Sequence, residues 1–128
     1  MEEALNESDP VRRRALLHVV VVGGGPTGVE VAGTLSEMKR HVLPKDYPQL
    51  DFKDMRITLV EAGPKLLGPM SEIASKKAKQ YLEQLGVDVK TGVAIKQYAG
   101  ETASLSDGST CETALMVWAA GVRANRLA

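Results

Sequence analysis

The sequence contains few of the residues that build disulfides, metal centres and aromatic-rich sites. Its 128 residues include one cysteine, Cys111, which excludes an internal disulfide and a multi-cysteine metal site. Aromatic residues are also scarce, with one tryptophan, three tyrosines and one phenylalanine. The core must therefore be built from valine, leucine, isoleucine and alanine.

An excess of charge of one sign is absent as well. Sixteen Lys and Arg balance sixteen Asp and Glu, which argues against a nucleic-acid partner. No run of 18 apolar residues occurs, so we expect no direct membrane insertion by this segment. Residues 1–12 are polar and lack the apolar core of a secretory signal, and we expect a flexible leader there. Length and composition predict one globular domain over residues 13–128.

The apolar pattern begins with a strand and continues with a helix. Val19–Val22 are four consecutive valines, as in a parallel strand buried on both faces. A helix is predicted over Pro26–Arg40. One stripe of this helix is apolar and consists of Val31, Leu35, Met38 and Val42. A second stripe has mostly small residues, which suit close packing on a sheet: Val29, Ala32, Gly33 and Ser36.

The remaining pattern alternates between strands and helices. We expect an irregular connection over 41–56, which begins with a possible helix extension, and then a strand over Ile57–Glu61. A helix follows over Ser71–Leu85, capped by Ser71 and ended by Gly86. The rest consists of strands over 87–89, 93–99, 102–106 and 115–118, with a turn at Asp107–Gly108. This order predicts an α/β, Rossmann-like three-layer domain. Its central parallel sheet carries helices on one side and a small antiparallel β-meander on the other.

The first turn matches the dinucleotide-binding pattern G-x-G-x-x-G over Gly23–Gly28. Gly23 would permit the tight turn, Gly25 would admit a pyrophosphate, and Gly28 would let the helix pack closely. The free N–H groups and positive dipole end of the helix favour phosphate, and Pro26 fits its first turn. The alternative is a glycine turn with a structural role alone.

An acidic residue closes the next strand, where such sites hold a ribose. Glu61 follows Gly28 by 33 residues, and 33 less the 16 of segment 41–56 leaves 17, near the usual spacing. A carboxylate there would accept hydrogen bonds from ribose hydroxyls and repel the 2′-phosphate of NADPH. Glu61 therefore predicts NADH over NADPH, against the alternative of an exposed strand-end glutamate. Residues alone leave Glu30 open between a structural and a functional role.

No arrangement typical of a catalytic or metal site is visible. His18 and His41 have no partner at metal or catalytic spacing and are interpreted as structural. Since no residue is placed to carry chemistry itself, we expect a domain that holds a cofactor.

Three segments resemble the type II NADH dehydrogenases, which are single-chain NADH:quinone oxidoreductases. They are Arg14–Gly33, Ile57–Ala62 and Val117–Val122. The resemblance implies the NADH-binding domain of a larger flavoprotein whose FAD domain is absent here. We therefore expect a fragment that binds NADH but is inactive alone. In the parent, hydride would pass to FAD and electrons onward to a quinone.

The resemblance also assigns roles to single residues. It implies that the glycine loop holds the pyrophosphate, that Glu61 binds the adenosine ribose, and that Glu30 positions the nicotinamide. Ala120 and Gly121 would lie near the nicotinamide, where the chain returns to the flavin domain. The predicted cofactor-binding residues are Gly23, Gly24, Gly25, Pro26, Thr27, Gly28, Glu30, Glu61, Ala62, Ala120 and Gly121.

Several alternatives remain open at the level of sequence. The chain could belong to another FAD-dependent pyridine-nucleotide reductase, because the electron acceptor is chosen outside this segment. It could be a non-enzymatic NAD-sensing module, or the loop could bind the ADP half of FAD. The family suggests the periphery of the mitochondrial inner membrane, another organelle or the bacterial cytoplasmic membrane. Membrane side, organelle, quinone and oligomeric state stay undetermined.

Overall fold

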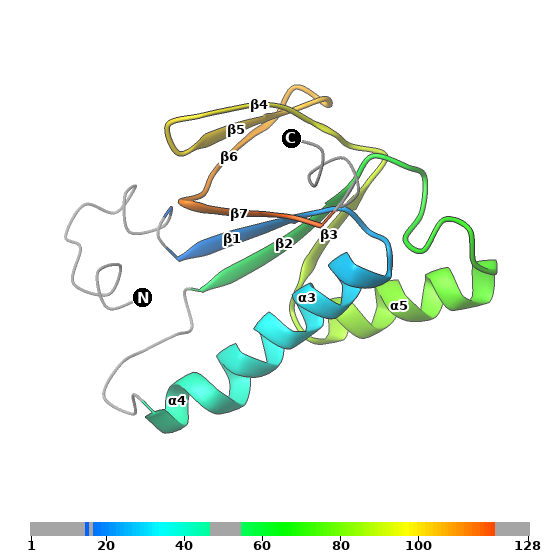
Figure 1. Cartoon of the computed structure of the whole chain (residues 1–128), viewed down its shortest axis with the longest axis horizontal. Coiled ribbons are helices and arrows are strands. Elements are labelled where there is room, and N and C mark those ends of the chain that lie inside the picture. Colours follow the sequence, from blue (N-terminus) through cyan, green and yellow to red (C-terminus); the bar gives the residue numbers. More distant parts are fainter. Residues whose placement is uncertain (1–14, 16, 47–54, 120–128) are drawn as a thin grey trace, which may run out of the picture.

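A computed structural model describes residues 15, 17–46 and 55–119, which form three layers (Figure 1). A four-stranded sheet of order β3-β2-β1-β7 lies between two helices and a three-stranded sheet of order β4-β5-β6. This confirms the predicted α/β, Rossmann-like architecture. The elements, in chain order, are β1 (His18–Val22), α3 (Pro26–Glu37), the π-helix η1 (Met38–Val42), α4 (Leu43–Asp46), β2 (Arg56–Glu61), α5 (Glu72–Gln84), β3 (Asp88–Thr91), β4 (Ile95–Ala99), β5 (Thr102–Leu105), β6 (Thr110–Glu112) and β7 (Leu115–Trp118).

The central sheet is parallel throughout. β1 is buried along its whole length and pairs with β2 on one side and β7 on the other. Val22 lies opposite Val60 and Trp118, so the carboxyl ends of three strands meet at one edge of the sheet. In parallel sheets this edge is where ligands bind.

Successive residues of these strands face opposite layers, as strand geometry requires. Ile57 and Leu59 join the core under the helices, whereas Val60 joins a smaller cluster under the meander. Every apolar residue of β1 and β2 is buried: Val19, Val20, Val21, Val22, Ile57, Leu59 and Val60. The valine run is apolar on both faces because both faces are covered.

Helix α3 packs on the sheet through its small residues. Its buried positions are Gly28, Ala32, Gly33 and Ser36. The predicted apolar stripe lies partly outside the core, with Met38 38% and Val42 45% exposed. Val31 and Leu35 of that stripe do pack against the core, so only its C-terminal half departs from the predicted packing. The small side chains decide the contact because they allow the closest approach of helix and sheet.

The helix also ends differently from the prediction. Regular α-helix stops at Glu37, and the chain continues as η1 and α4 to Asp46 instead of becoming irregular at residue 41. The helix extension was thus correct, although it contains a π-helical turn. β2 begins at Arg56, within the predicted connection. Residues 47–54, the predicted leader 1–12, Ala120 and Gly121 lie outside the described residues.

Helix α5 follows its predicted capping. The Ser71 hydroxyl accepts a hydrogen bond from the Ala74 amide at 3.1 Å, and Gly86 ends the helix with φ +89°. Leu82 is fully buried on the sheet side, whereas Tyr81, predicted on the same stripe, is 47% exposed. Its ring lies beside Gly33 of α3 instead of entering the sheet contact.

The meander covers the opposite face. β4, β5 and β6 are antiparallel, and the Asp107–Gly108 turn between the last two carries a positive φ at Gly108, as predicted. The first two strands are shorter than predicted, since β4 begins at Ile95 and β5 ends at Leu105. Strand β3 runs from Asp88 to Thr91, beyond the predicted 87–89.

Two polar residues join the parallel sheet to the end of the meander and the residue after it. His18 Nδ1 lies 2.8 Å from the backbone carbonyl of Glu112, and the Thr113 hydroxyl donates to the His18 carbonyl. The structural interpretation of His18 agrees with these bonds. None of the helices in the described part of the chain has the length and apolar character needed to cross a membrane.

Candidate functional site

The glycine loop lies at the carboxyl edge of the parallel sheet, between β1 and α3 (Figure 1). Gly23 leaves the strand with φ +116°, a conformation that favours glycine, and its amide donates to the Val60 carbonyl at 2.8 Å. The turn out of β1 is therefore fixed to the end of β2. This sets the loop directly beside the residue that follows Val60.

That residue is Glu61, and its carboxylate is held by two backbone amides. Oε1 accepts from Gly24 N at 2.7 Å, and Oε2 accepts from Gly63 N at 2.6 Å. The structure thus brings the predicted acid and the glycine loop together. A carboxylate has about four acceptor positions, so these two bonds leave about two for a further donor.

Gly25 and Gly28 differ sharply in the space around them. A Cβ atom on Gly25 would meet no heavy atom within 4 Å, so this position is open to the surroundings. A Cβ atom on Gly28 would lie 1.7 Å from the Gly23 carbonyl oxygen. Gly28 is therefore required by the packing of loop against helix, whereas Gly25 leaves room for a ligand.

The N-terminus of α3 has no capping side chain among the described residues. Gly25 occupies the N-cap position with φ −75° and ψ −173°, and Pro26 follows in the first turn. No acidic side chain lies in that turn. The first-turn amides, with the positive end of the helix dipole, suit an anion such as a phosphate.

Leu66 and Leu67 contact the glycine loop in a way that sequence analysis missed. The Leu67 amide donates to the Gly24 carbonyl at 2.8 Å, and the Leu66 side chain packs against Gly24. Leu67 adopts φ +51°, which is uncommon for a residue other than glycine. No pattern in the sequence signals this conformation, since leucine does not favour it.

The other predicted residues are spread around this centre. Pro26, Thr27 and Ala62 are exposed near the loop. Glu30 is exposed on α3 and lines a shallow hollow with Gly33 and Tyr81. The structure therefore joins Glu61 to the loop by a hydrogen bond, whereas Glu30 lines the hollow beside Gly33 and Tyr81.

The chain after β7 also approaches the loop. Ala119 donates its amide to the Val22 carbonyl at 2.8 Å, and its Cβ lies 3.6 Å from the position a Gly28 Cβ would occupy. Ala120 and Gly121 follow it directly but lie outside the described residues. Within the described ranges, no group of three His, Cys, Asp or Glu residues is arranged to hold a metal ion.

Comparison with protein families defines the class. Residues 2–128 match the pyridine nucleotide-disulphide oxidoreductase family, and the chain belongs to that family. Among curated proteins it is 40% identical, over 98% of its length, to the type II NADH:quinone oxidoreductase Ndh of Mycobacterium tuberculosis. It covers 28% of that protein. The chain is thus similar to one segment of a type II NADH dehydrogenase, as the sequence motifs indicated.

Solved structures agree on the fold. NDH2 from Plasmodium falciparum in complex with NADH matches with a TM-score of 0.84 and 24% identity, covering 94% of this chain and 26% of the other. A ferredoxin reductase from Rhodopseudomonas palustris matches with a TM-score of 0.65 and 24% identity, over 81% of this chain and 24% of that one. The chain spans about a quarter of the length of these relatives.

Proposed function

We propose that this chain binds NADH at the glycine loop and forms the NADH-binding part of a flavin-dependent NADH:quinone oxidoreductase. The observation that carries the proposal is the bond between the Glu61 carboxylate and the Gly24 amide, 2.7 Å long. It holds an acid beside an uncapped helix N-terminus. One end of this site suits ribose hydroxyls, and the other suits a pyrophosphate.

The residues then have distinct tasks. The first-turn amides of α3 bind the pyrophosphate, which approaches over the open position at Gly25. The remaining acceptor positions of Glu61 take the adenosine ribose hydroxyls and disfavour a 2′-phosphate. Glu30, Ala120 and Gly121 contribute to the nicotinamide end.

The hydride acceptor lies outside this chain. FAD, bound by the rest of the parent protein, supplies the redox chemistry, and a quinone receives the electrons. The part of this chain is to hold and orient NADH so that its nicotinamide C4 faces the flavin. A quinone acceptor suits a parent protein placed at the periphery of a membrane.

Titration calorimetry with NADH and NADPH tests the site, using the wild-type chain and Glu61→Gln. We expect wild type to prefer NADH and the variant to lose about tenfold or more in NADH affinity together with the preference, because hydrogen bonds to a charged group are lost. Glu83→Gln, an exposed change on α5, is the matched control. Equal NADH affinity of Glu61→Gln and wild type would overturn the role of Glu61.

The fold likeness to a ferredoxin reductase supports a second candidate, an NADH-binding domain of another flavin-dependent reductase. The two differ only in the electron acceptor. The parent protein assayed with NADH and either a soluble quinone or a ferredoxin separates them. Faster turnover with the quinone supports the first proposal, and faster turnover with ferredoxin supports the second.

A further inference from the structure

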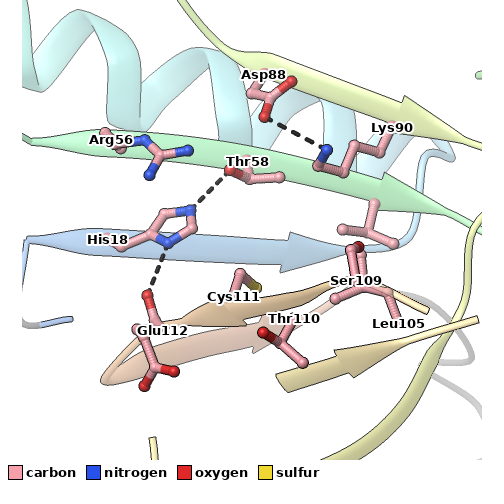
Figure 2. A pocket seen from close by; sticks show the side chains of 11 residues that line it. His18, Arg56, Thr58, Asp88, Lys90, Leu105, Ser109, Thr110, Cys111 and Glu112 are labelled. Carbon is pink, nitrogen blue, oxygen red and sulfur yellow. Dashed lines mark hydrogen bonds and ion pairs between the residues drawn. The ribbon is translucent and has the colours of Figure 1, made fainter. Parts of the chain in front are cut away.

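A second cavity lies on the other face of the parallel sheet, between the sheet and the meander (Figure 2). Its volume is about 280 Å³. It lies on the meander-facing side of β1, β2 and β3, whereas the glycine loop follows the carboxyl end of β1. Neither Glu61 nor any residue of Gly23–Gly28 lines it. The lining residues are His18, Arg56, Thr58, Val60, Asp88, Lys90, Leu105, Ser109, Thr110, Cys111 and Glu112.

The polar character of this cavity is unexpected for a parallel sheet covered on both faces. Strands of this type are usually apolar on each side. Here Arg56 and Thr58 of β2 face the meander, while their neighbours Ile57 and Leu59 face the helices. Asp88 and Lys90 do the same on β3 around Val89. The opposite face, under the helices, instead presents Ile57, Leu59 and Val89 to the core.

Most polar groups in the cavity have partners within the described residues. Asp88 and Lys90 form an ion pair with an N···O distance of 3.9 Å. The Glu112 carboxylate accepts from the Thr102 hydroxyl at 2.9 Å. His18 uses both ring nitrogens, on the Glu112 carbonyl and the Thr58 hydroxyl. These groups account for both acids and for the histidine.

Arg56 is different from the other charged residues. Among the described residues its guanidinium makes no hydrogen bond or ion pair, although its backbone amide donates to the Leu17 carbonyl. Its positive charge acts on Cys111, another residue of the cavity lining. Burial raises the pKa of the Cys111 thiol, and Arg56 is the largest influence opposing that rise. The Thr110 hydroxyl, on the facing strand, likewise has no partner among the described residues.

We propose that this cavity binds a small oxyanion, a molecule carrying a carboxylate or phosphate group, with the Arg56 guanidinium as its main donor. A guanidinium presents paired N–H groups that match both oxyanions. Lys90 lies in the same lining, already paired with Asp88, and Thr110 offers a hydroxyl. A volume of about 280 Å³ is near the lower end for small-molecule pockets and too small for a dinucleotide. The site is separate from the proposed NADH site.

Amide NMR spectra of the chain, recorded without NADH, test this proposal. Sodium phosphate and sodium succinate are the two probes, and sodium chloride at equal ionic strength is the reference. We expect saturable shifts at Thr58, Lys90 and Cys111 with at least one probe. Saturation with phosphate alone identifies a phosphoryl ligand, and saturation with succinate alone identifies a carboxylate. Shifts that match those in sodium chloride would overturn the proposal.

Two variants assign the effect to Arg56. Arg56→Gln should raise the dissociation constant of the better probe about tenfold or more, because a charge-assisted bond is lost. Lys96→Gln removes the same charge from an exposed site on β4 outside the cavity and should change it less than twofold. If Arg56→Gln does not give a dispersed spectrum, Arg56→Lys keeps the charge without the paired donors and should weaken binding severalfold. Unchanged affinity in the folded Arg56 variant would refute the site.

Discussion

A Cβ atom on Gly28 would lie 1.7 Å from the carbonyl oxygen of Gly23. The backbone of the glycine loop and the backbone of helix α3 are therefore in direct contact at this point. The last glycine of the G-x-G-x-x-G pattern is thus a packing requirement. The middle one, Gly25, has no such neighbour. The pattern therefore combines two physical demands that alanine substitutions can separate.

Alanine at Gly28 should disturb the fold. We expect Gly28→Ala to lower the free energy of unfolding by about 1–3 kcal/mol or more, since backbone must move to admit the methyl group. Gly25→Ala should change it by less than about 1 kcal/mol, because φ there is −75° and the space is open. Urea unfolding measures both values.

The same pair distinguishes folding from binding. Gly25→Ala should weaken NADH binding about tenfold or more while the protein stays folded, because the methyl group occupies the approach of the pyrophosphate. Calorimetric titration measures this effect. A Gly25→Ala variant with wild-type affinity would show that the open space at Gly25 is not used by the nucleotide.

His18 should make stability depend on pH. Its Nδ1 faces a carbonyl and must carry the hydrogen, so in the neutral ring Nε2 accepts from Thr58, 2.7 Å away. Burial, opposed by the Glu112 carbonyl bond and aided by Arg56, lowers its pKa below the ordinary 6.5. The unfolded chain therefore takes up a proton more readily than the folded one. The contribution of His18 to the free energy of unfolding is therefore fully present above pH 6.5 and is lost as the pH drops below that value.

Urea unfolding between pH 8 and pH 5.5 checks this dependence. His18→Gln should reduce the slope of the unfolding free energy against pH. It should also lower stability at pH 8 by about 1–3 kcal/mol through lost hydrogen bonds. His41→Gln, at a histidine whose side chain is 68% exposed, should keep the slope. A slope unchanged by His18→Gln would assign the pH dependence to other groups.

Thr113 should be a sensitive position for stability. It is fully buried, and its hydroxyl lies within hydrogen-bonding distance of the His18 carbonyl and of Leu115. We expect Thr113→Val to cost about 1–3 kcal/mol, because buried backbone groups lose their partner. Thr110→Val, at an exposed position, should change stability by about 0.5 kcal/mol or less. Thermal or urea unfolding compares the two, and equal effects would contradict the assignment.

Ala32 should tolerate no larger side chain. It is fully buried where α3 meets the sheet, so Ala32→Leu should destabilise the fold by about 1–3 kcal/mol or more. Thr34→Leu, exposed two residues further along α3, serves as the control and should have a much smaller effect. A stable Ala32→Leu protein would show that helix and sheet can separate without loss.

The parts of the fold that depend on local sequence were predictable. Val19–Val22, the glycine loop and the acid at residue 61 define a strand, a turn and a neighbouring strand end through composition and order alone. The Ser71 cap and the Gly86 stop are equally local.

Features that depend on distant partners were not predictable. The face of α3 that meets the sheet is determined by close approach, so Ala32, Gly33 and Ser36 are buried while Met38 and Val42 are exposed. The two bonds of His18 reach residues 40 and 94 positions away. The cavity beside Arg56 exists only once three strands and the meander are assembled.

The order of the parallel sheet has a consequence for how the chain is made. Strand β1 is an inner strand, and one of its two neighbours, β7, is the last strand of the described chain. During synthesis, the nascent chain therefore presents Val19–Val22 with one hydrogen-bonding edge vacant until Leu115–Trp118 have emerged from the ribosome. Closure of the sheet is thus a late, long-range event. A buried valine strand thus keeps an unpaired edge until the last described strand has been made, and unpaired strand edges favour aggregation.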